Sequence, residues 1–101
     1  MRYFIIGDED AVLGFGLVGV AGTVATSVAQ AQEAFSTVLE QSDIGIIIIT
    51  ERVADLIRPQ VDQFIFTRSF PLIVEIPDRR GPLSGKPGIR EMVNKAIGIR
   101  L

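Results

Sequence analysis

Hydrophobic and polar positions along this chain predict four strands that alternate with helices. Residues 44–50 read Ile-Gly-Ile-Ile-Ile-Ile-Thr and leave no polar face, so we expect a central strand that is covered on both sides. Shorter strands are predicted at residues 3–6, 22–28 and 72–76, the last of them directly after Pro71. β-Branched residues suit the pleated, buried surface of such strands.

Helices are predicted where apolar residues recur every three or four positions. The first begins at about Ala11, after a short acidic run, and the third follows Thr50 as its cap. Pro59 should kink or end that third helix, and Gly98 should stop the last one. The apolar stripes are Ala31, Ala34, Phe35, Val38 and Leu39 in the second helix; Val53, Ile57, Val61 and Phe64 or Ile65 in the third; and Ile89, Met92, Val93, Ala96 and Ile97 in the last.

This order of elements predicts an α/β fold with a single doubly wound domain. Right-handed crossovers give a four-stranded parallel sheet in the order 2-1-3-4, with helices on both faces and a tethered C-terminal helix. Residues 1–76 form the predicted core, 77–88 a flexible Pro/Gly linker, and 89–101 the C-terminal amphipathic helix. The predicted hinge positions in the linker are Pro77, Gly81, Pro82, Gly85 and Pro87.

Composition narrows the function classes. The 101 residues include no cysteine, histidine or tryptophan, which excludes disulfides, Ser/His/Asp triads and Cys/His zinc sites. A net charge of −2 gives no overall attraction to nucleic acid or anionic lipid. The N-terminus lacks the pattern of a signal peptide, and the longest weakly polar stretch, residues 11–25, is shorter than the roughly 17 to 25 residues that span a bilayer. We therefore expect a cytoplasmic chain without membrane insertion.

Two glycine-rich motifs resemble phosphate-binding loops but have the wrong context. Residues 14–19 spell GxGxxG, yet they come too late after the first strand, so we expect Gly16 and Gly19 to lie with Val12 and Phe15 on a helix face that packs closely on the sheet. Residues 84–87 read Ser-Gly-Lys-Pro, in which proline replaces the magnesium-binding Ser/Thr of a P-loop. That segment is interpreted as a tether.

The acidic run of residues 8–10 supports an alternative function. Asp8 and Asp10 follow the first strand, where a receiver-like signalling domain holds magnesium, although Thr50 stands where such a domain carries its phosphoacceptor aspartate. Helix capping is the simpler interpretation of these acids. A flavodoxin-like domain that binds a small ligand is the other alternative.

Four runs of sequence, in this order, resemble the F subunit of the V/A-type (vacuolar/archaeal-type) ATPases. They are residues 4–15 (Phe-Ile-Ile-Gly-Asp-Glu-Asp-Ala-Val-Leu-Gly-Phe), 43–51 (Asp-Ile-Gly-Ile-Ile-Ile-Ile-Thr-Glu), 71–78 (Pro-Leu-Ile-Val-Glu-Ile-Pro-Asp) and 88–101. The resemblance implies a non-catalytic component of the rotating central stalk, without a cofactor, at the periphery of the membrane. It also implies binding to the coiled-coil D subunit and a role in coupling ATP hydrolysis or synthesis to ion translocation.

The resemblance further implies that the C-terminal helix can detach and reach the A/B catalytic headpiece, and it makes the socket subunit above the membrane ring another candidate partner. We expect the stripe of this regulatory helix to consist of Ile89, Met92, Val93 and Ile97. The exposed side of the second predicted helix is poor in lysine and arginine, and we expect it to contact the stalk. Its predicted contact residues are Thr26, Ser27, Ala29, Gln30, Gln32, Glu33 and Glu40; no catalytic, cofactor-binding or metal-binding residue is predicted.

Overall fold

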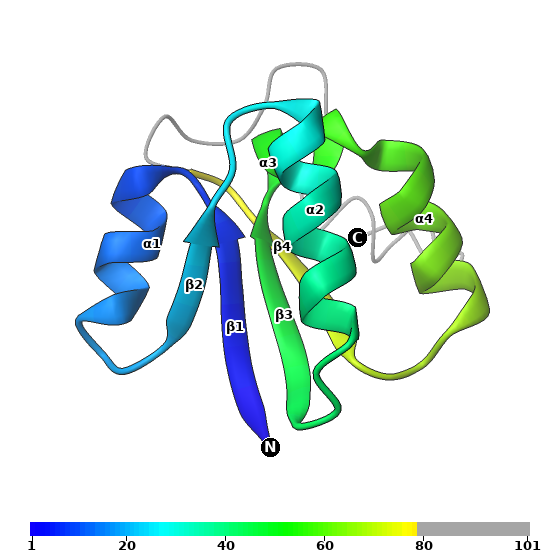
Figure 1. Cartoon of the computed structure of the whole chain (residues 1–101), viewed down its shortest axis with the longest axis horizontal. Coiled ribbons are helices and arrows are strands. Elements are labelled where there is room, and N and C mark those ends of the chain that lie inside the picture. The colour runs from blue at the N-terminus through cyan, green and yellow to red at the C-terminus, as the bar shows by residue number, and fades with distance from the viewer. Residues whose placement is uncertain (79–101) are drawn as a thin grey trace, which may run out of the picture.

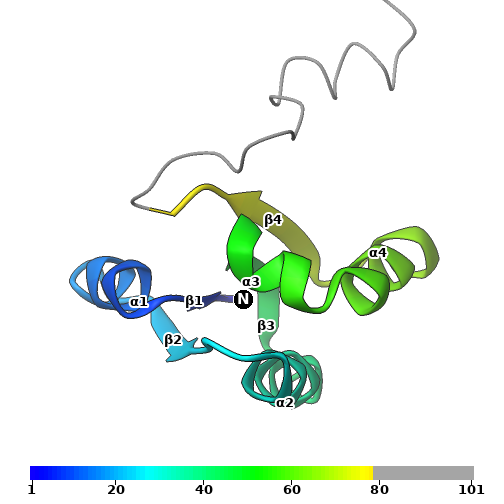
Figure 2. The ribbon, with the colours of Figure 1, turned by 90° about the horizontal axis from the view of Figure 1, so that it is seen from above.

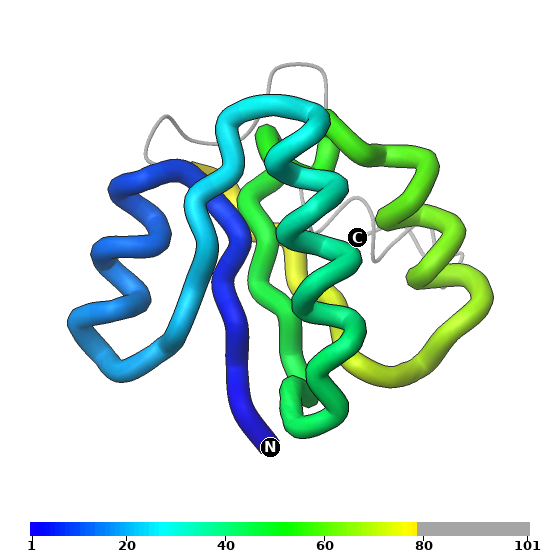
Figure 3. The backbone as a smooth tube through the Cα atoms, in the orientation of Figure 1, coloured from blue at the N-terminus to red at the C-terminus, as the bar shows by residue number. Residues whose placement is uncertain are grey.

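The computed structural model of this protein describes residues 1–78, which form one four-stranded parallel sheet with helices on both faces (Figure 1). The elements are β1 (Arg2–Gly7), α1 (Glu9–Gly16), β2 (Ala21–Val24), α2 (Val28–Leu39), β3 (Ile44–Thr50), α3 (Glu51–Leu56), α4 (Arg58–Thr67) and β4 (Leu72–Ile76). The strand order is β2-β1-β3-β4, and every pair is parallel. The predicted fold class and strand order are confirmed. The chain crosses from β2 over the carboxyl edge of the sheet to α2 (Figure 3).

One face of the sheet, which we call the α2 side, carries the main hydrophobic core. Ile47 and Ile49 of β3 lie there beside Ile6 of β1 and are fully buried. Helices α2, α3 and α4 supply most of the rest of this core, and α2 and α4 meet where the rings of Phe35 and Phe64 pack edge to face with their centroids 5.8 Å apart. The view from above shows α2 and α4 along one side, whereas α1 lies beside β1 and β2 (Figure 2).

The described helices cover the other face, which we call the α1 side, over only half its width. Ile5 of β1 is fully buried there, because α1 packs over β1 and β2. Ile5 is in register with Ile48 of β3, which in turn is in register with Val74 of β4, so these three side chains share the face. No described helix packs over the β3–β4 half, and Val74 remains 38% exposed.

The helix boundaries follow from local capping. Asp8 accepts a hydrogen bond from the Ala11 N–H at 2.8 Å, so α1 begins two residues earlier than the predicted start at about Ala11. The third predicted helix is divided at Ile57, whose backbone (φ −129°, ψ 36°) is not helical, and Pro59 is the second residue of α4. The predicted effect of this proline is therefore confirmed.

The second strand is shorter than the predicted range 22–28. It ends at Val24, because the next residues cap α2 instead of continuing the sheet. Ser27 accepts a hydrogen bond from the Gln30 N–H at 3.2 Å, and the Gln30 side chain accepts from the Thr26 N–H at 2.9 Å. Thr26 and Ser27 carry hydroxyl groups that suit either an exposed strand or a helix cap, and in this structure they cap α2.

The expectation that the GxGxxG glycines bring the first helix close to the sheet is wrong. No residue of α1 is buried, and a Cβ atom added at Gly14 or Gly16 would meet nothing within 4 Å. Gly19 lies beyond the helix in a turn with φ +88°, which explains why glycine occurs there. A glycine that leaves room for its neighbours is found instead at Gly22 of β2. A Cβ atom there would lie 2.7 Å from the Ile5 carbonyl oxygen of β1 and 3.3 Å from Cγ1 of Val12 in α1.

Candidate functional site

The exposed side of α2 forms one continuous surface, which we call the docking face. It comprises Thr26, Ser27, Ala29, Gln30, Gln32, Glu33 and Glu40, all of which are exposed. The opposite side of the helix, represented by Ala31, Phe35 and Val38, is buried against the sheet. Because the core fixes the rotation of α2 about its axis, the predicted contact residues are displayed together. This arrangement leaves them all accessible to one partner.

The docking face has a distinct electrostatic character. No lysine or arginine occurs between Arg2 and Arg52, so the whole segment that contains β2, α2 and their connections carries no basic side chain. Glu33 and Glu40 are the charged groups of α2 and its cap, and they are surrounded by amide, hydroxyl and methyl groups. Such a surface suits a partner that presents polar and basic side chains.

Sequence reasoning missed the β2 residues that extend the docking face. A shallow cavity of about 390 Å³ is found elsewhere, but a second one of about 350 Å³ lies between β2 and α2. Its lining is Thr23, Val24, Gln30, Glu33, Ala34 and Thr37. Val24 is 41% exposed, because β2 is an edge strand and β1 is its only neighbour among the strands of residues 1–78. The predicted strand order 2-1-3-4 already placed the second strand at the edge of the sheet, but it did not indicate that side chains of this strand would lie beside the exposed side of α2.

A second exposed surface lies on the uncovered half of the α1 side. Leu72 and Val74 project from β4 of this half beside the buried Ile48, and Tyr3 projects from the neighbouring β1 in the same row as Leu72. We call Tyr3, Leu72 and Val74 together the open apolar half. Tyr3 is 50% exposed and Leu72 is 55% exposed. A contiguous apolar surface that the described residues leave uncovered is typical of a surface for another segment or protein.

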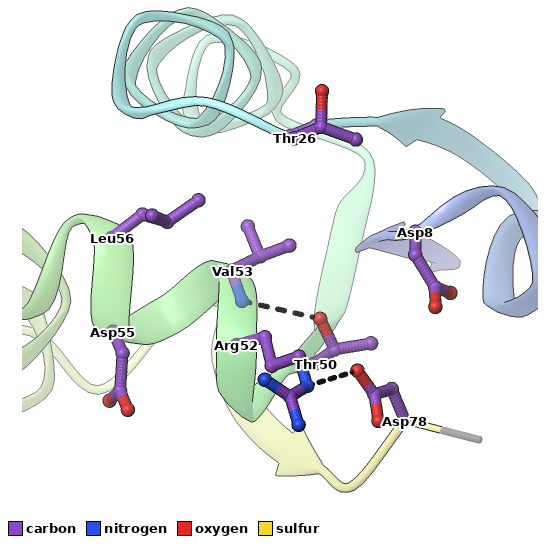
Figure 4. A pocket seen from close by; sticks show the side chains of 9 residues that line it. Asp8, Thr26, Thr50, Arg52, Val53, Asp55, Leu56 and Asp78 are labelled. Carbon is purple, nitrogen blue, oxygen red and sulfur yellow. Dashed lines mark hydrogen bonds and ion pairs between the residues drawn. The ribbon is translucent and has the colours of Figure 1, made fainter. Parts of the chain in front are cut away.

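The larger cavity, of about 390 Å³, lies at the carboxyl edge of the sheet, where doubly wound folds usually bind ligands. Its walls come from the ends of β1 and β3, the segment after β2, α3, and the residues after β4; they include Asp8, Thr26, Thr50, Arg52, Asp55 and Asp78 (Figure 4). Arg52 Nε lies 2.8 Å from Asp78 Oδ2. This pair closes one side of the cavity.

The groups in this cavity already serve structural roles. Asp8 caps α1, and Thr50 Oγ1 accepts a hydrogen bond from the Val53 N–H at 3.4 Å at the start of α3. A receiver would need a carboxylate at the position that Thr50 occupies, so the receiver-like alternative lacks its phosphoacceptor. Within residues 1–78, no three acidic, histidine or cysteine side chains are grouped to hold a metal ion. The carboxylates of Asp8, Asp55 and Asp78 would also repel the phosphate of FMN or a nucleotide.

Most residues of the predicted linker and regulatory helix lie outside the described part of the chain. Pro77 is described and exposed, directly after β4. The hinge positions Gly81, Pro82, Gly85 and Pro87 and the stripe of Ile89, Met92, Val93 and Ile97 fall beyond residue 78. Of the helices in residues 1–78, none combines the length and apolar character that crossing a bilayer requires.

Comparison with known proteins identifies relatives over essentially the whole sequence. The sequence model for the family of the ATP synthase (F/14-kDa) subunit matches residues 4–93. The F subunit of the A-type ATP synthase of Thermococcus sibiricus is 36% identical, over 100% of this chain and 98% of the relative. Its counterpart in Pyrococcus furiosus is 38% identical with the same coverage, and the probable V-type proton ATPase F subunit of Caenorhabditis elegans is 35% identical over 94% of this chain and 85% of its own length.

A solved structure shares the fold. The crystal structure of the V-type ATP synthase F subunit of Archaeoglobus fulgidus superimposes with a TM-score of 0.59 at 24% identity. The match covers 74% of this chain and 95% of that one. The two chains therefore share the doubly wound core.

Proposed function

This chain belongs to the family of the ATP synthase (F/14-kDa) subunit, and we propose that it is a non-catalytic part of the rotating central stalk of such a complex. The family membership makes it an F subunit of an A-type or V-type ATPase. The finer assignment is that it binds the coiled-coil D subunit and helps to couple ATP hydrolysis or synthesis to ion translocation. The observation that carries this assignment is the docking face of α2, a continuous exposed surface without a basic side chain.

A coiled coil is a suitable partner for this surface on physical grounds. The docking face runs along a 12-residue helix, which is about 18 Å long and can lie against another helix over several turns. Ala29 is small enough to let the two backbones approach closely. The shallow cavity beside Val24 and Ala34 can accept an apolar side chain from the partner, while Glu33 at its rim can pair with a lysine or arginine.

Arginine substitutions on the docking face test this assignment. Replacing Ala29 and Gln32 together by arginine should abolish the one-to-one complex with the coiled-coil partner, because two long cations would occupy the contact surface. The matched control replaces Gln60 and Gln63, two exposed residues of α4, by arginine. The mass of the complex is read by light scattering on a sizing column. A docking-face variant that assembles as well as the control would refute the assignment.

The second part of the proposal concerns residues 89–101 as a mobile regulatory element. The open apolar half of Tyr3, Leu72 and Val74 offers one position for its apolar stripe, and the A/B headpiece offers the other. Residues 77–88 could extend to roughly 40 Å, whereas four strands are only about 15 to 20 Å wide, so the linker is long enough for either position. Exchange between the positions requires that their free energies differ by only a few kcal/mol.

Hydrogen exchange tests the first position in the isolated chain. Replacing Val74 by glutamate places a charge in the open apolar half and should speed exchange in residues 89–97 several-fold while leaving β3 protected. Replacing Val28, a valine of α2 that is 47% exposed, by glutamate is the control. Equal exchange of residues 89–97 in the Val74 variant, the Val28 variant and the unmodified chain would refute this position.

A further inference from the structure

A shallow groove of about 340 Å³ lies between the end of α4 and the beginning of β4, and we call it the α4–β4 groove. Figure 1 shows this junction at the end of the sheet farthest from α1. The groove borders β4, whereas the cavity of the docking face borders β2, the opposite edge strand, so the two surfaces are separate. Its lining consists of Phe64, Ile65, Arg68, Ser69, Pro71, Leu72 and Ile73.

Exposed apolar side chains surround the α4–β4 groove. Ile65 of α4 and Leu72 of β4 both line it and are exposed, and Phe70, which directly precedes Pro71, is 54% exposed. Leu72 also belongs to the open apolar half, so the apolar surface continues around the edge of β4. Exposed apolar and aromatic side chains around a groove are typical of a contact surface for another protein.

The groove also contains an arginine that differs from the others in its surroundings. The basic side chains of residues 1–78 are Arg2, Arg52, Arg58 and Arg68, and the first three each form an ion pair with a carboxylate. The guanidinium carbon of Arg68 instead lies 5.7 Å from the centre of the Phe64 ring, and no carboxylate of residues 1–78 pairs with it. A carboxylate from a partner would complement this charge.

Arg68 is held in place before a partner binds. Its guanidinium lies over the Phe64 ring, which is nearly buried and packs edge to face on Phe35 of α2. Stacking on a ring leaves the N–H groups at the edge of the guanidinium available, and their geometry matches the two oxygens of a carboxylate. Because the arginine is already ordered, less side-chain entropy is lost on binding.

The lining of the groove favours a protein segment over a phosphate group. Arg68 is the only charged residue among the described residues that line it, and all the others except Ser69 are apolar. Phosphate recognition usually requires several cations, whereas one arginine beside an apolar wall suits a single carboxylate with apolar neighbours.

We propose that the α4–β4 groove binds an acidic, apolar segment of a neighbouring subunit of the complex. One aspartate or glutamate of this segment pairs with Arg68, and an adjacent aliphatic or aromatic side chain fills the groove between Ile65 and Leu72. Phe70 contacts the segment at the rim. The contact rests on membership of the family, which makes this chain one subunit of a larger complex, and not on the assignment of the docking face to the coiled coil.

Site-specific photo-cross-linking in the assembled complex tests the occupant. The photoreactive amino acid p-benzoylphenylalanine replaces Phe70 in the full chain, and mass spectrometry identifies the peptide to which it becomes linked. The control places the same amino acid at Leu17, an exposed position at the end of α1. Position 70 should cross-link to one segment of another subunit in which an aspartate or glutamate lies within a few residues of apolar side chains, and position 17 should not reach that segment.

Three outcomes of this cross-linking would overturn the proposal. They are the absence of a cross-link from position 70 to another subunit, a cross-link only to residues 79–101 of the same chain or to a second copy of it, and a cross-link to a segment without an acidic residue. A chain that fails to bind the coiled coil but still cross-links through position 70 would refute the assignment of the docking face alone.

Charge exchange tests the pairing with Arg68. Titration calorimetry measures the affinity of the full chain for the cross-linked subunit. Arg68→Gln should weaken binding about three- to tenfold and Arg68→Glu by more than tenfold, whereas Arg68→Lys should weaken it less than Arg68→Gln. The control is Gln63→Glu, which adds a carboxylate at an exposed position of α4 outside the groove and should leave the affinity nearly unchanged.

The matching change in the partner completes the test. Replacing the partner's carboxylate by lysine should weaken binding to the unmodified chain and restore a large part of the binding of Arg68→Glu, which an effect of Arg68 on folding alone would not produce. Equal affinities of Arg68→Glu and Gln63→Glu, or a partner change that restores nothing, would overturn the pairing.

Discussion

Replacing Gly22 by alanine should lower the free energy of unfolding, although alanine is the better residue for a regular backbone. Gly22 of β2 lies beside Ile5 of β1, and a Cβ atom there would lie 2.7 Å from the Ile5 carbonyl oxygen and 3.3 Å from Cγ1 of Val12 on α1. The carbonyl oxygen is part of the backbone of a central strand and cannot rotate away. Relief of the contact therefore requires β2 to shift against β1.

The expected magnitude follows from two opposing contributions. Overpacking of a tight contact costs about 1 to 3 kcal/mol. Alanine recovers about 0.5 to 1 kcal/mol, because it restricts the unfolded chain more than glycine does. The net loss should be about 1 to 2 kcal/mol, a large part of the roughly 5 to 15 kcal/mol by which a domain of this size is stable.

Gly14→Ala is the matched control. Gly14 lies inside α1, and an added Cβ atom would have nothing within 4 Å, so the same substitution should stabilise the protein by about 0.5 to 1 kcal/mol. Urea unfolding followed by circular dichroism measures both effects. With a slope of about 1 to 2 kcal/mol per M, the midpoint of Gly22→Ala should fall by roughly 1 M and that of Gly14→Ala should rise by about 0.5 M. A Gly22 variant as stable as the Gly14 variant would refute the close approach of β2 to α1 and β1.

Two further predictions concern charged side chains. Arg58 donates two hydrogen bonds of 2.7 and 2.8 Å to Glu75, and this carboxylate is the main cause of the raised pKa of the Arg58 guanidinium. Replacing Arg58 by methionine should lower the free energy of unfolding, measured by chemical denaturation, by about 1 to 3 kcal/mol. A loss under about 0.5 kcal/mol would contradict the role of this pair in joining α4 to β4. The hydrogen bond from Arg2 lowers the pKa of Asp43 below its ordinary value. The ionised Asp43 carboxylate therefore stabilises the protein above its pKa in the unfolded chain, and this stabilisation is lost as the pH falls through its pKa in the folded chain. Between about pH 5 and 2, Arg2→Gln should lose less stability than the unmodified chain, and parallel pH profiles of the two proteins would contradict this.

Local pattern was sufficient for the parts of the fold that depend on neighbouring residues. The consecutive isoleucines of β3 can only be buried on both faces, and this made it the central strand. The apolar spacing of Ala31, Phe35 and Val38 fixed the buried side of α2 and therefore its exposed side as well. With four strands and right-handed crossovers, few strand orders remained, and the predicted one was confirmed.

Local pattern failed where two residue preferences competed or where the outcome depended on distant neighbours. Thr26 and Ser27 suit either an edge strand or a helix cap, and the cap prevailed because Gln30 could complete it. The spacing of the α1 glycines also fits a close helix–sheet contact, yet α1 packs over the edge strand and no side chain of it is more than partly buried. The register of β2 against β1 decided instead that Gly22 would be the close contact.

The sequence by itself determined the order of the described elements along the chain, the burial of β3 and the exposed side of α2, because each depends on periodicity within about a dozen residues. Tertiary structure alone decided that the β3–β4 half of the α1 side would be uncovered within residues 1–78, and that Arg58 would meet Glu75 and Arg52 would meet Asp78. Partners so far apart in sequence meet only when parallel strands bring their ends to one edge of the sheet. A local sequence pattern cannot predict which of these distant residues will meet, because the packing of whole helices and strands brings them together.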